Sequence, residues 1–224
     1  MKKTLEDLRE NPKVELFIRK ADEQLAGLGY TEHGIRHATW VSKNTEYVLR
    51  ELGYDSRIVE LGKIAGFLHD IGNLINREHH AQVGAVLAGN ILEEEGFDLD
   101  EVADIMMAIG NHHEEDGYPV SVLSAALILA DKADVHRSRV RKGTVNLDNL
   151  QKDIHDRVNY SATKSFIEVD ATKKIVRYKI EVDTKIAPVV DYFRIFLQRM
   201  LIASKSARFL NAKFELFIND TKMM

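Results

Sequence analysis

Cysteine is absent from this sequence of 224 residues, which excludes disulfide bonds and thiolate ligands for a metal. Any metal site must therefore be built from histidine, aspartate and glutamate. No apolar run reaches the roughly 20 residues that a membrane-spanning helix needs. The first ten residues, MKKTLEDLRE, also lack the apolar core of a secretion signal. We therefore expect a cytoplasmic protein that has no membrane partner.

Neither sign of charge dominates the sequence. It has 31 lysines and arginines against 35 aspartates and glutamates, which gives a formal net charge of −4. The chain thus lacks the overall positive field that draws a protein onto nucleic acid, and this argues against nucleic acid as a partner. Hydrophobic residues make up 45% and charged residues 29%, as is usual for a globular protein. The length suffices for a full hydrophobic core.

Apolar residues recur with helical spacing through most of the chain, and this spacing predicts a bundle of helices. Near Gly143 the pattern changes, because two stretches that alternate like strands, 165–170 and 175–183, follow a short helix over 147–158. A long helix from Pro188 and a last strand at 214–218 complete a β-β-α-β order. We predict a mainly α protein, with a helical domain over residues 1–145 and a small α+β region over 146–224. We expect the second region to form an antiparallel sheet with a covering helix. We also expect it to pack on the bundle or to make a homodimer contact.

Histidine is unevenly distributed, and seven of the nine histidines fall in four tight groups beside predicted helices. These groups are His33 with His37, His69, His79 with His80, and His112 with His113. His69 and Asp70 end the apolar run 58–68, which is typical of a buried helix, and Gly72 follows as a possible stop signal. A buried His–Asp pair is costly unless it is paired or binds a metal. Imidazole and carboxylate together suit Fe, Mn, Ni, Co or Zn, so the clustering predicts a metal site with one or two ions.

The spacing of these residues resembles the HD-domain superfamily of metal-dependent phosphohydrolases, over roughly residues 30–140. That family's pattern is a single histidine, a His-Asp pair about one helix later, and a distant aspartate. Here these are His37, the pair His69-Asp70, and Asp131 in the run ILADKAD. The resemblance implies a helical domain in which these four residues bind a first divalent metal.

Three further histidines, His80, His112 and His113, resemble the second-metal positions of the subgroup named for its HD and GYP motifs. The resemblance implies that they bind a second ion together with Asp70 as a bridging ligand. The run HHEEDGYP at 112–119 is similar to that subgroup but shorter, and Asn73 stands where a lysine is usual. At the position of His33 the phosphodiesterases of the superfamily carry a carboxylate ligand, so the role of His33 stays open.

Two cations can hold a phosphoryl group for in-line displacement, and such a reaction also needs cations that bind the substrate and a proton donor. We predict catalytic roles for Asp70 and His69, and we consider Glu114 as a general acid, with Glu78 as the alternative. The basic residues that follow Asp131 would bind phosphate. We favour Lys132, and also Arg137 with Arg141, because the latter two would share one face of a continuing helix.

The sequence therefore favours a phosphohydrolase that acts on a nucleotide or another small phosphate ester, with one or two divalent ions (Fe, Mn, Ni, Co, Zn or Mg) per chain. Two alternatives remain. The same ligand set resembles di-iron oxygenases of the superfamily, and a binding module that retains the metal pocket without turnover would look similar. The sequence does not define the substrate, the native metal or the oligomeric state, although we expect a homodimer.

Overall fold

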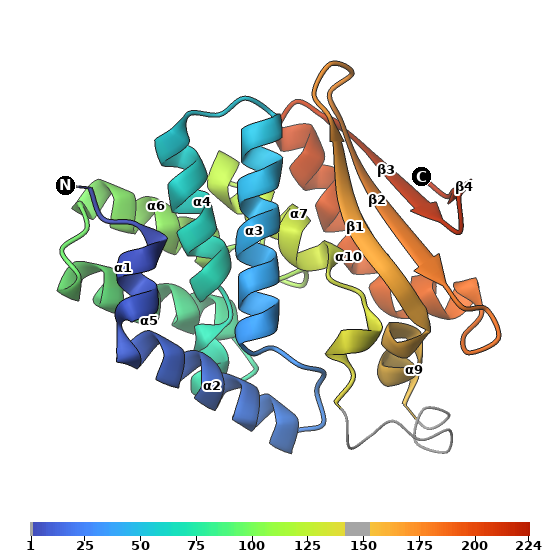
Figure 1. Ribbon diagram of the computed structural model, residues 1–224, viewed down its shortest axis with the longest axis horizontal. Helices are drawn as coiled ribbons and strands as arrows, with labels where there is room; N and C mark the ends of the chain where they lie inside the picture. The colour runs from blue at the N-terminus through green and yellow to red at the C-terminus, as the bar shows by residue number, and fades with distance from the viewer. Residues whose placement is uncertain (1, 142–152) are drawn as a thin grey trace.

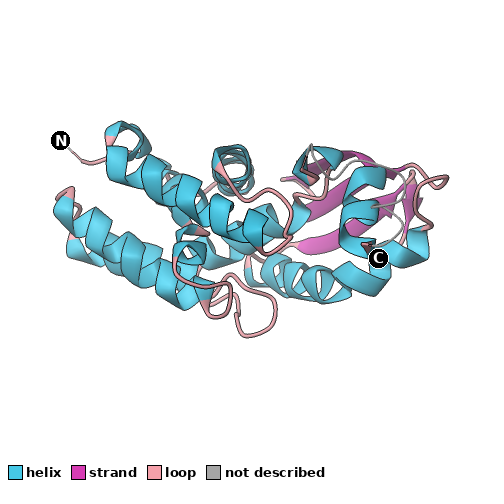
Figure 2. Cartoon of the chain, turned by 90° about the horizontal axis from the view of Figure 1, so that it is seen from below, coloured by secondary structure: helices cyan, strands magenta, loops and turns pink. Residues whose placement is uncertain are grey.

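The structure is a computed structural model, which describes residues 2–141 and 153–224. Helices form the first part of the chain, and a small sheet lies at the other end of the molecule (Figures 1 and 2). This arrangement confirms the predicted fold class. In chain order the elements are α1 (Leu5–Glu10), α2 (Pro12–Gly27), α3 (Ile35–Glu51), α4 (Ser56–Leu68), η1 (Ile71–Leu74), α5 (His80–Glu94), α6 (Leu99–Gly110), α7 (Val122–Ala133), η2 (Arg137–Arg139), α9 (Ile154–Ser161), β1 (Ala162–Asp170), β2 (Ile175–Val182), α10 (Val189–Phe209), β3 (Lys213–Ile218) and β4 (Thr221–Lys222).

Local signals in the sequence explain where several helices begin. The Asp55 side chain accepts hydrogen bonds from the first backbone N–H groups of α4, and Asp98 and Ser121 cap α6 and α7 in the same way. Asn11 caps α2, whose first residue is Pro12, a residue favoured at the first position of a helix. Helix α3 has Gly34 as its N-cap, without a side-chain capping hydrogen bond.

Helix α7 is the centre of the bundle, and its residues 123–133 are all buried. It packs against α3, α4, α6 and α10 (Figure 1). The sequence predicted that this helix continues to Arg137, but it ends at Ala133. Asp134 leaves the helical conformation (φ −77°, ψ 75°), and a short 3₁₀ helix, η2, follows. Side chains after Ala133 therefore do not share the face on which Asp131 lies.

The C-terminal sheet has the strand order β1-β2-β3-β4 and is mixed rather than antiparallel. Strands β1 and β2 form the predicted antiparallel hairpin, whereas β3 pairs with β2 in parallel. Helix α10 connects β2 to β3, and such a helical crossover returns the chain in the same direction. The short strand β4, which the sequence analysis did not predict, extends the edge beside β3.

The sheet is joined to the helical bundle by buried polar contacts. The Tyr178 hydroxyl on β2 donates a hydrogen bond to the Leu129 carbonyl of α7 at 2.6 Å, and the Ser165 hydroxyl on β1 donates to the Ala133 carbonyl. The C-terminal region thus packs on the bundle, as one of the two expectations had it. The predicted boundary at 145/146 and the first half of the helix expected over 147–158 lie outside the described residues, and α9 includes the part from Ile154. The division into two domains stays a prediction. Among the described helices, none is both long and apolar enough to span a membrane.

Candidate metal centre

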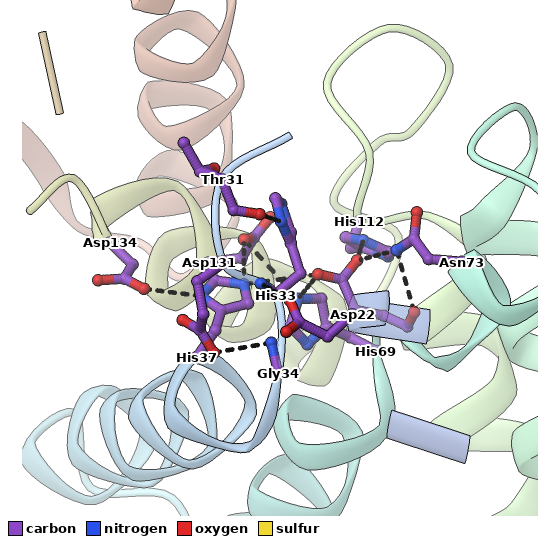
Figure 3. Close-up of polar contacts among 12 residues, drawn as sticks. Asp22, Thr31, His33, Gly34, His37, His69, Asn73, His112, Asp131 and Asp134 are labelled. Carbon is purple, nitrogen blue, oxygen red and sulfur yellow. Dashed lines mark hydrogen bonds and ion pairs between the residues drawn. The ribbon is translucent and has the colours of Figure 1, made fainter. Parts of the chain in front are cut away.

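Six of the seven predicted metal ligands meet at one point inside the bundle. They come from the ends of five helices, where side chains can converge without distorting a helix. His37 lies in the first turn of α3 and Asp131 in the last turns of α7, as Figure 3 shows. His69 and Asp70 directly follow α4, His80 is the first residue of α5, and His112 comes just after α6. All six are buried, with at most 8% of any of them exposed.

Asp70 lies at the middle of the cluster, and each of its carboxylate oxygens faces a different set of histidines. Its Oδ2 lies 3.6 Å from Nε2 of His37 and 3.3 Å from Nε2 of His69. Its Oδ1 lies 3.6 Å from Nε2 of His80 and 3.8 Å from Nε2 of His112. Asp131 closes the first set, with Oδ1 3.4 Å from Nε2 of His37. Three groups of possible ligand atoms, each within 4.8 Å of one another, can be formed from these six residues.

Backbone carbonyls fix the tautomer of three of these histidines. Nδ1 of His69, His80 and His112 lies 2.7–2.9 Å from the carbonyl of the residue three positions earlier. A carbonyl can only accept a hydrogen bond, so each Nδ1 carries the proton and each Nε2 keeps its lone pair. The four rings, including that of His37, thus turn Nε2 toward the two aspartates. In metal sites generally, a hydrogen bond from the ring nitrogen that does not bind the metal orients the histidine.

The cluster fits divalent cations because its polar atoms otherwise lack partners. Nε2 of His37 and Nε2 of His69 are buried without a hydrogen bond among the described residues. Buried polar atoms of this kind are rare and need an explanation. Two carboxylates and four imidazoles form a donor set that suits Zn or a first-row transition metal. In this centre, His37, His69, Asp70 and Asp131 would hold one ion, and Asp70, His80 and His112 would hold the other.

The electrostatics of the cluster agree with that assignment. Burial, with the charge of His112, lowers the pKa of His80 to about 2, and burial also lowers the pKa of His112. Both rings are therefore neutral near pH 7, as metal binding requires. Burial raises the pKa of Asp70 and Asp131, but the nearby His69 and Lys132, respectively, outweigh it and keep both pKa values well below the ordinary range. Burial lowers the pKa of His69, but the two carboxylates outweigh this effect and raise it. The centre of the cluster thus favours positive charge.

Asp134 supports His37 from behind. Its Oδ2 accepts a hydrogen bond from Nδ1 of His37 at 2.7 Å and contacts Arg36 at 2.9 Å and Arg139 at 3.4 Å. Only 1% of Asp134 is exposed. Figure 3 shows this carboxylate on the far side of His37 from Asp131. Asp134 therefore fixes the orientation of a proposed ligand without itself facing the ions.

Replacing Asp134 with asparagine should weaken metal binding by about 10–100-fold, because the neutral amide oxygen accepts the hydrogen bond from His37 more weakly than a carboxylate does. Competition with a chromophoric chelator would measure the affinity. The matched control is Asp191→Asn, since Asp191 also pairs with an arginine, Arg157 at 3.0 Å, but belongs to none of the ligand groups. Wild-type affinity in Asp134→Asn would contradict the assignment.

The seventh predicted ligand, His113, lies beside the cluster rather than in it. Its ring centroid is 4.8 Å from that of His80, but its Nδ1 contacts Asp116 at 3.4 Å, and none of the three ligand groups contains it. His79, next to His80, is exposed and has a left-handed backbone (φ 58°). Of that pair, His80 is the residue whose Nε2 faces Asp70, at 3.6 Å from Oδ1.

Glu114 and Lys132 form an ion pair next to the cluster. Nζ of Lys132 lies 2.6 Å from Oε2 of Glu114 and 2.5 Å from Oδ2 of Asp131. Burial raises the pKa of Glu114, but Lys132 and Arg199 outweigh it and hold that pKa well below its usual value. An ionised Glu114 is better suited to accept a proton than to donate one, which differs from the role expected from the sequence. Glu78, the alternative acid, is exposed.

The two predicted phosphate-binding arginines lie elsewhere. Arg141 contacts Asp22 at 2.7 Å, and Arg137 stacks over the Tyr160 ring, 5.3 Å from its centroid. Neither lines the cavity beside the cluster. The reason is the early end of α7, because the expected shared helical face does not exist beyond Ala133. Their role in phosphate binding stays a prediction.

A cavity of about 410 Å³ opens onto the cluster. His33 lines it, with Nδ1 2.6 Å from the Thr31 carbonyl, and so do the predicted Glu114 and Lys132. The sequence analysis did not identify Arg77, Arg139, Asn159, Phe196 or Arg199, which also line it. Arg139 belonged to the basic stretch considered after Asp131. Nothing in the sequence connects Phe196 and Arg199 of α10 with residues some 65 positions earlier, so only the fold could reveal them.

A model of the HD domain family matches residues 34–139. That range contains all seven predicted metal ligands, and it ends at Arg139, so α9, the sheet and α10 lie beyond it.

Several curated proteins are similar to this chain. Ribonuclease Y of Lawsonia intracellularis is 35% identical over 105 residues, covering 46% of this chain and 18% of that protein. Ribonuclease Y of Latilactobacillus sakei is 32% identical over 145 residues, covering 63% of this chain and 25% of that protein. An uncharacterized protein of Methanocaldococcus jannaschii is 26% identical, with 61% of each chain covered. The chain thus spans a quarter or less of the length of these two ribonucleases. A crystal structure of a predicted HD superfamily hydrolase from an uncultured Thermotogales bacterium matches with a TM-score of 0.46 and 26% identity, over 60% of this chain and 75% of that one.

Proposed function

The chain belongs to the HD-domain superfamily through residues 34–139, and from this premise we propose that it is a divalent-metal-dependent phosphohydrolase acting on a small phosphate ester, such as a nucleotide. The observation that supports this most is the position of Asp70, whose two oxygens face separate pairs of histidines. A carboxylate placed in this way can bridge two ions. The HD domain and its hydrolase relatives support hydrolysis in general, and the substrate class is our own inference.

Divalent cations held by these residues would supply the positive charge that polarises phosphoryl oxygens and activates water for in-line displacement. The chain's own residues would prepare that reaction. Asp70 and Asp131 would hold the ions, and the hydrogen bonds from Nδ1 of His69, His80 and His112 to backbone carbonyls keep Nε2 of each ring aimed inward. Lys132 holds Asp131 and Glu114 in place at 2.5 and 2.6 Å. Glu114, kept ionised, is the nearby group that can accept a proton. Groups fixed in this way stabilise the charge of a transition state most strongly in a site from which water is excluded.

The first test is hydrolysis by protein purified without added metal or chelator. We expect close to two ions per chain by elemental analysis, and release of the alcohol from p-nitrophenyl phosphate or from a mononucleotide. Stripping with a chelator should abolish turnover, and Mn²⁺, Fe²⁺, Co²⁺, Ni²⁺, Zn²⁺ or Mg²⁺ should restore it to different extents. Turnover under anaerobic conditions separates hydrolysis from the oxygenase alternative, since hydrolysis needs no O₂. A metal-loaded protein that binds nucleotides but hydrolyses no ester would contradict the proposal.

A second candidate is cleavage of RNA, which the similarity to two ribonuclease Y proteins favours. Those matches cover a quarter or less of each ribonuclease, and the net charge of −4 provides no overall attraction for a polyanion. A short single-stranded RNA belongs in the substrate panel, and cleavage at internal positions would favour this candidate over the small ester. The homodimer and the cytoplasmic setting expected from the sequence stay predictions.

A further inference from the structure

Two arginines from different parts of the chain, Arg139, which is buried, and Arg199, which is half-buried, line the cavity beside the metal centre. Arg139 ends η2, at the last position that the HD domain model matches, and Arg199 lies on α10, well beyond it. Helix α10 packs directly against α7, which carries Asp131. The second arginine is therefore brought to the site by the C-terminal region.

Among the described residues, Arg199 has no carboxylate oxygen closer than 3.9 Å. Its hydrogen bond is to a neutral group, the Asp131 carbonyl, at 3.1 Å from Nη2. The nearest carboxylate oxygens belong to Asp131 at 3.9 Å and Glu114 at 4.0 Å, and both carboxylates are already bound by Lys132. Nε of Arg199 is buried and has no hydrogen-bond partner among the described residues. Its guanidinium lies over the Phe196 ring, 5.0 Å from the centroid, which fixes the plane of the group.

Arg139 is more deeply buried, with 3% of the residue exposed. Its Nη1 contacts Asp134 at 3.4 Å and lies 3.0 Å from Nδ1 of His37, but Asp134 is shared with Arg36. Nε of Arg139 also lacks a partner within the described parts of the chain. Burial lowers the pKa of Arg139, and the charge of Arg199 adds to that effect despite the opposing Asp134. The two guanidiniums therefore repel each other across one cavity.

Of the other two lysine and arginine side chains that line the cavity within the described residues, Lys132 is paired with carboxylates, whereas Arg77 contacts neutral groups, as the hydrogen bond of Arg199 does. Lys132 is held between Glu114 and Asp131. Arg77 donates to the Asn73 side chain at 3.3 Å and lies over the Tyr30 ring, 5.3 Å from the centroid. Buried charges are stable only when they are paired, and a guanidinium is well shaped to bind two oxygens of one phosphate.

We propose that Arg139 and Arg199 together bind the terminal phosphate of the substrate, and that this pair makes the enzyme a phosphomonoesterase rather than a phosphodiesterase. The inference rests on the proposed function and narrows it. A monoester phosphate carries nearly two negative charges and has three free oxygens, whereas a diester carries one charge and has two. Two cations beyond those of the metal centre favour the more highly charged group. The C-terminal region thereby completes a site whose metal ligands all lie within the HD domain.

The test uses the full chain with Arg199→Gln, and Arg199→Lys as the variant that keeps the charge. The matched control is Arg194→Gln, an exposed arginine on the same helix that does not line the cavity. Calorimetry with inorganic phosphate should show dissociation constants about 10–100-fold weaker for Arg199→Gln. The dissociation constant of Arg199→Lys should lie between those of the wild type and Arg199→Gln. The dissociation constant of the Arg194→Gln control should match that of the wild type. Metal content and melting temperature are measured in parallel, and both should stay unchanged in these variants.

Kinetics then separate this inference from the proposed function. Arg199→Gln should raise KM for p-nitrophenyl phosphate by about 10-fold or more and should change KM for bis(p-nitrophenyl) phosphate by much less. Equal losses for both esters, wild-type phosphate binding in Arg199→Gln, or a loss of metal from that variant would overturn the inference. A wild type that prefers the diester would overturn it while leaving the phosphohydrolase intact. Phosphate binding through Arg199 without turnover of any ester would instead contradict only the proposed function.

Discussion

Replacing Asp70 with alanine is expected to remove both metal binding and activity. Asp70 is the residue that faces both sets of histidines, so its loss leaves each ion without its shared ligand. If the ions supply several kcal/mol of transition-state stabilisation, kcat/KM should fall by about 10³-fold or more. Elemental analysis should show well below one ion per chain in Asp70→Ala, and p-nitrophenyl phosphate hydrolysis measures the activity.

The control for Asp70→Ala is Asp104→Ala on α6, which removes a carboxylate that belongs to no ligand group. This variant should keep wild-type metal content and rate. His69→Ala should resemble Asp70→Ala, and the double variant should be little worse than either single one, because residues that act as a unit show non-additive losses. If Asp70→Ala and His69→Ala both kept metal and activity, the assignment of the centre would have no basis.

The sequence was most informative where local signals decide the structure. Caps such as Asp55, Asp98 and Ser121 mark where α4, α6 and α7 begin, and His69, His112 and Asp131 lie toward the other ends of these helices. The family pattern then related His37, His69-Asp70 and Asp131 across more than ninety residues. For this reason the helical fold was predicted correctly, and six of the seven predicted ligands lie together in the structure.

The remaining features depend on contacts that no local pattern encodes. Arg199 reaches Asp131 only because α10 crosses over to make β3 parallel to β2, and strand direction cannot be read from alternation alone. Arg137 and Arg141 were favoured on the assumption of a continuous helix, which Asp134 interrupts. Asp134 itself looked like one more residue of that helix, although it is the group that holds His37. In each case the sequence did not indicate the direction that the backbone takes. That direction decides where these side chains lie and what they contact.

Gly72 shows a further limit of local interpretation and gives the prediction with the largest effect on stability. The sequence indicated a helix stop, but α4 ends at Leu68, and Gly72 has no positive φ. Its role is close packing instead. A Cβ at position 72 would lie 1.9 Å from the His80 carbonyl oxygen and 2.5 Å from the Gly84 nitrogen, both backbone atoms of α5. Helix α5 can therefore approach Asp70 only because residue 72 has no side chain.

Gly72→Ala should lower the free energy of unfolding by about 3 kcal/mol or more, because the backbone atoms that it meets cannot rotate away. For a chain of this size that corresponds to a fall in melting temperature of roughly 6–12 °C. A side chain at position 72 would push α5 away and would thereby move His80 away from Asp70. The ion held by His80 and His112 should therefore be lost before the ion held by His37. We expect close to one ion per folded chain by elemental analysis, against two in the wild type.

Gly27→Ala is the matched control, since a Cβ there meets nothing within 4 Å and the residue ends α2 without a positive φ. It should change stability by no more than about 1 kcal/mol and leave the metal content unchanged. Loss of stability in Gly72→Ala with both ions retained would mean that α5 and η1 move together, and the link between this glycine contact and the second ion would be wrong. Wild-type stability in Gly72→Ala would contradict the packing itself. The expected result, a weaker fold and one missing ion, would show that the spacing of two backbones determines how many metals the HD domain holds.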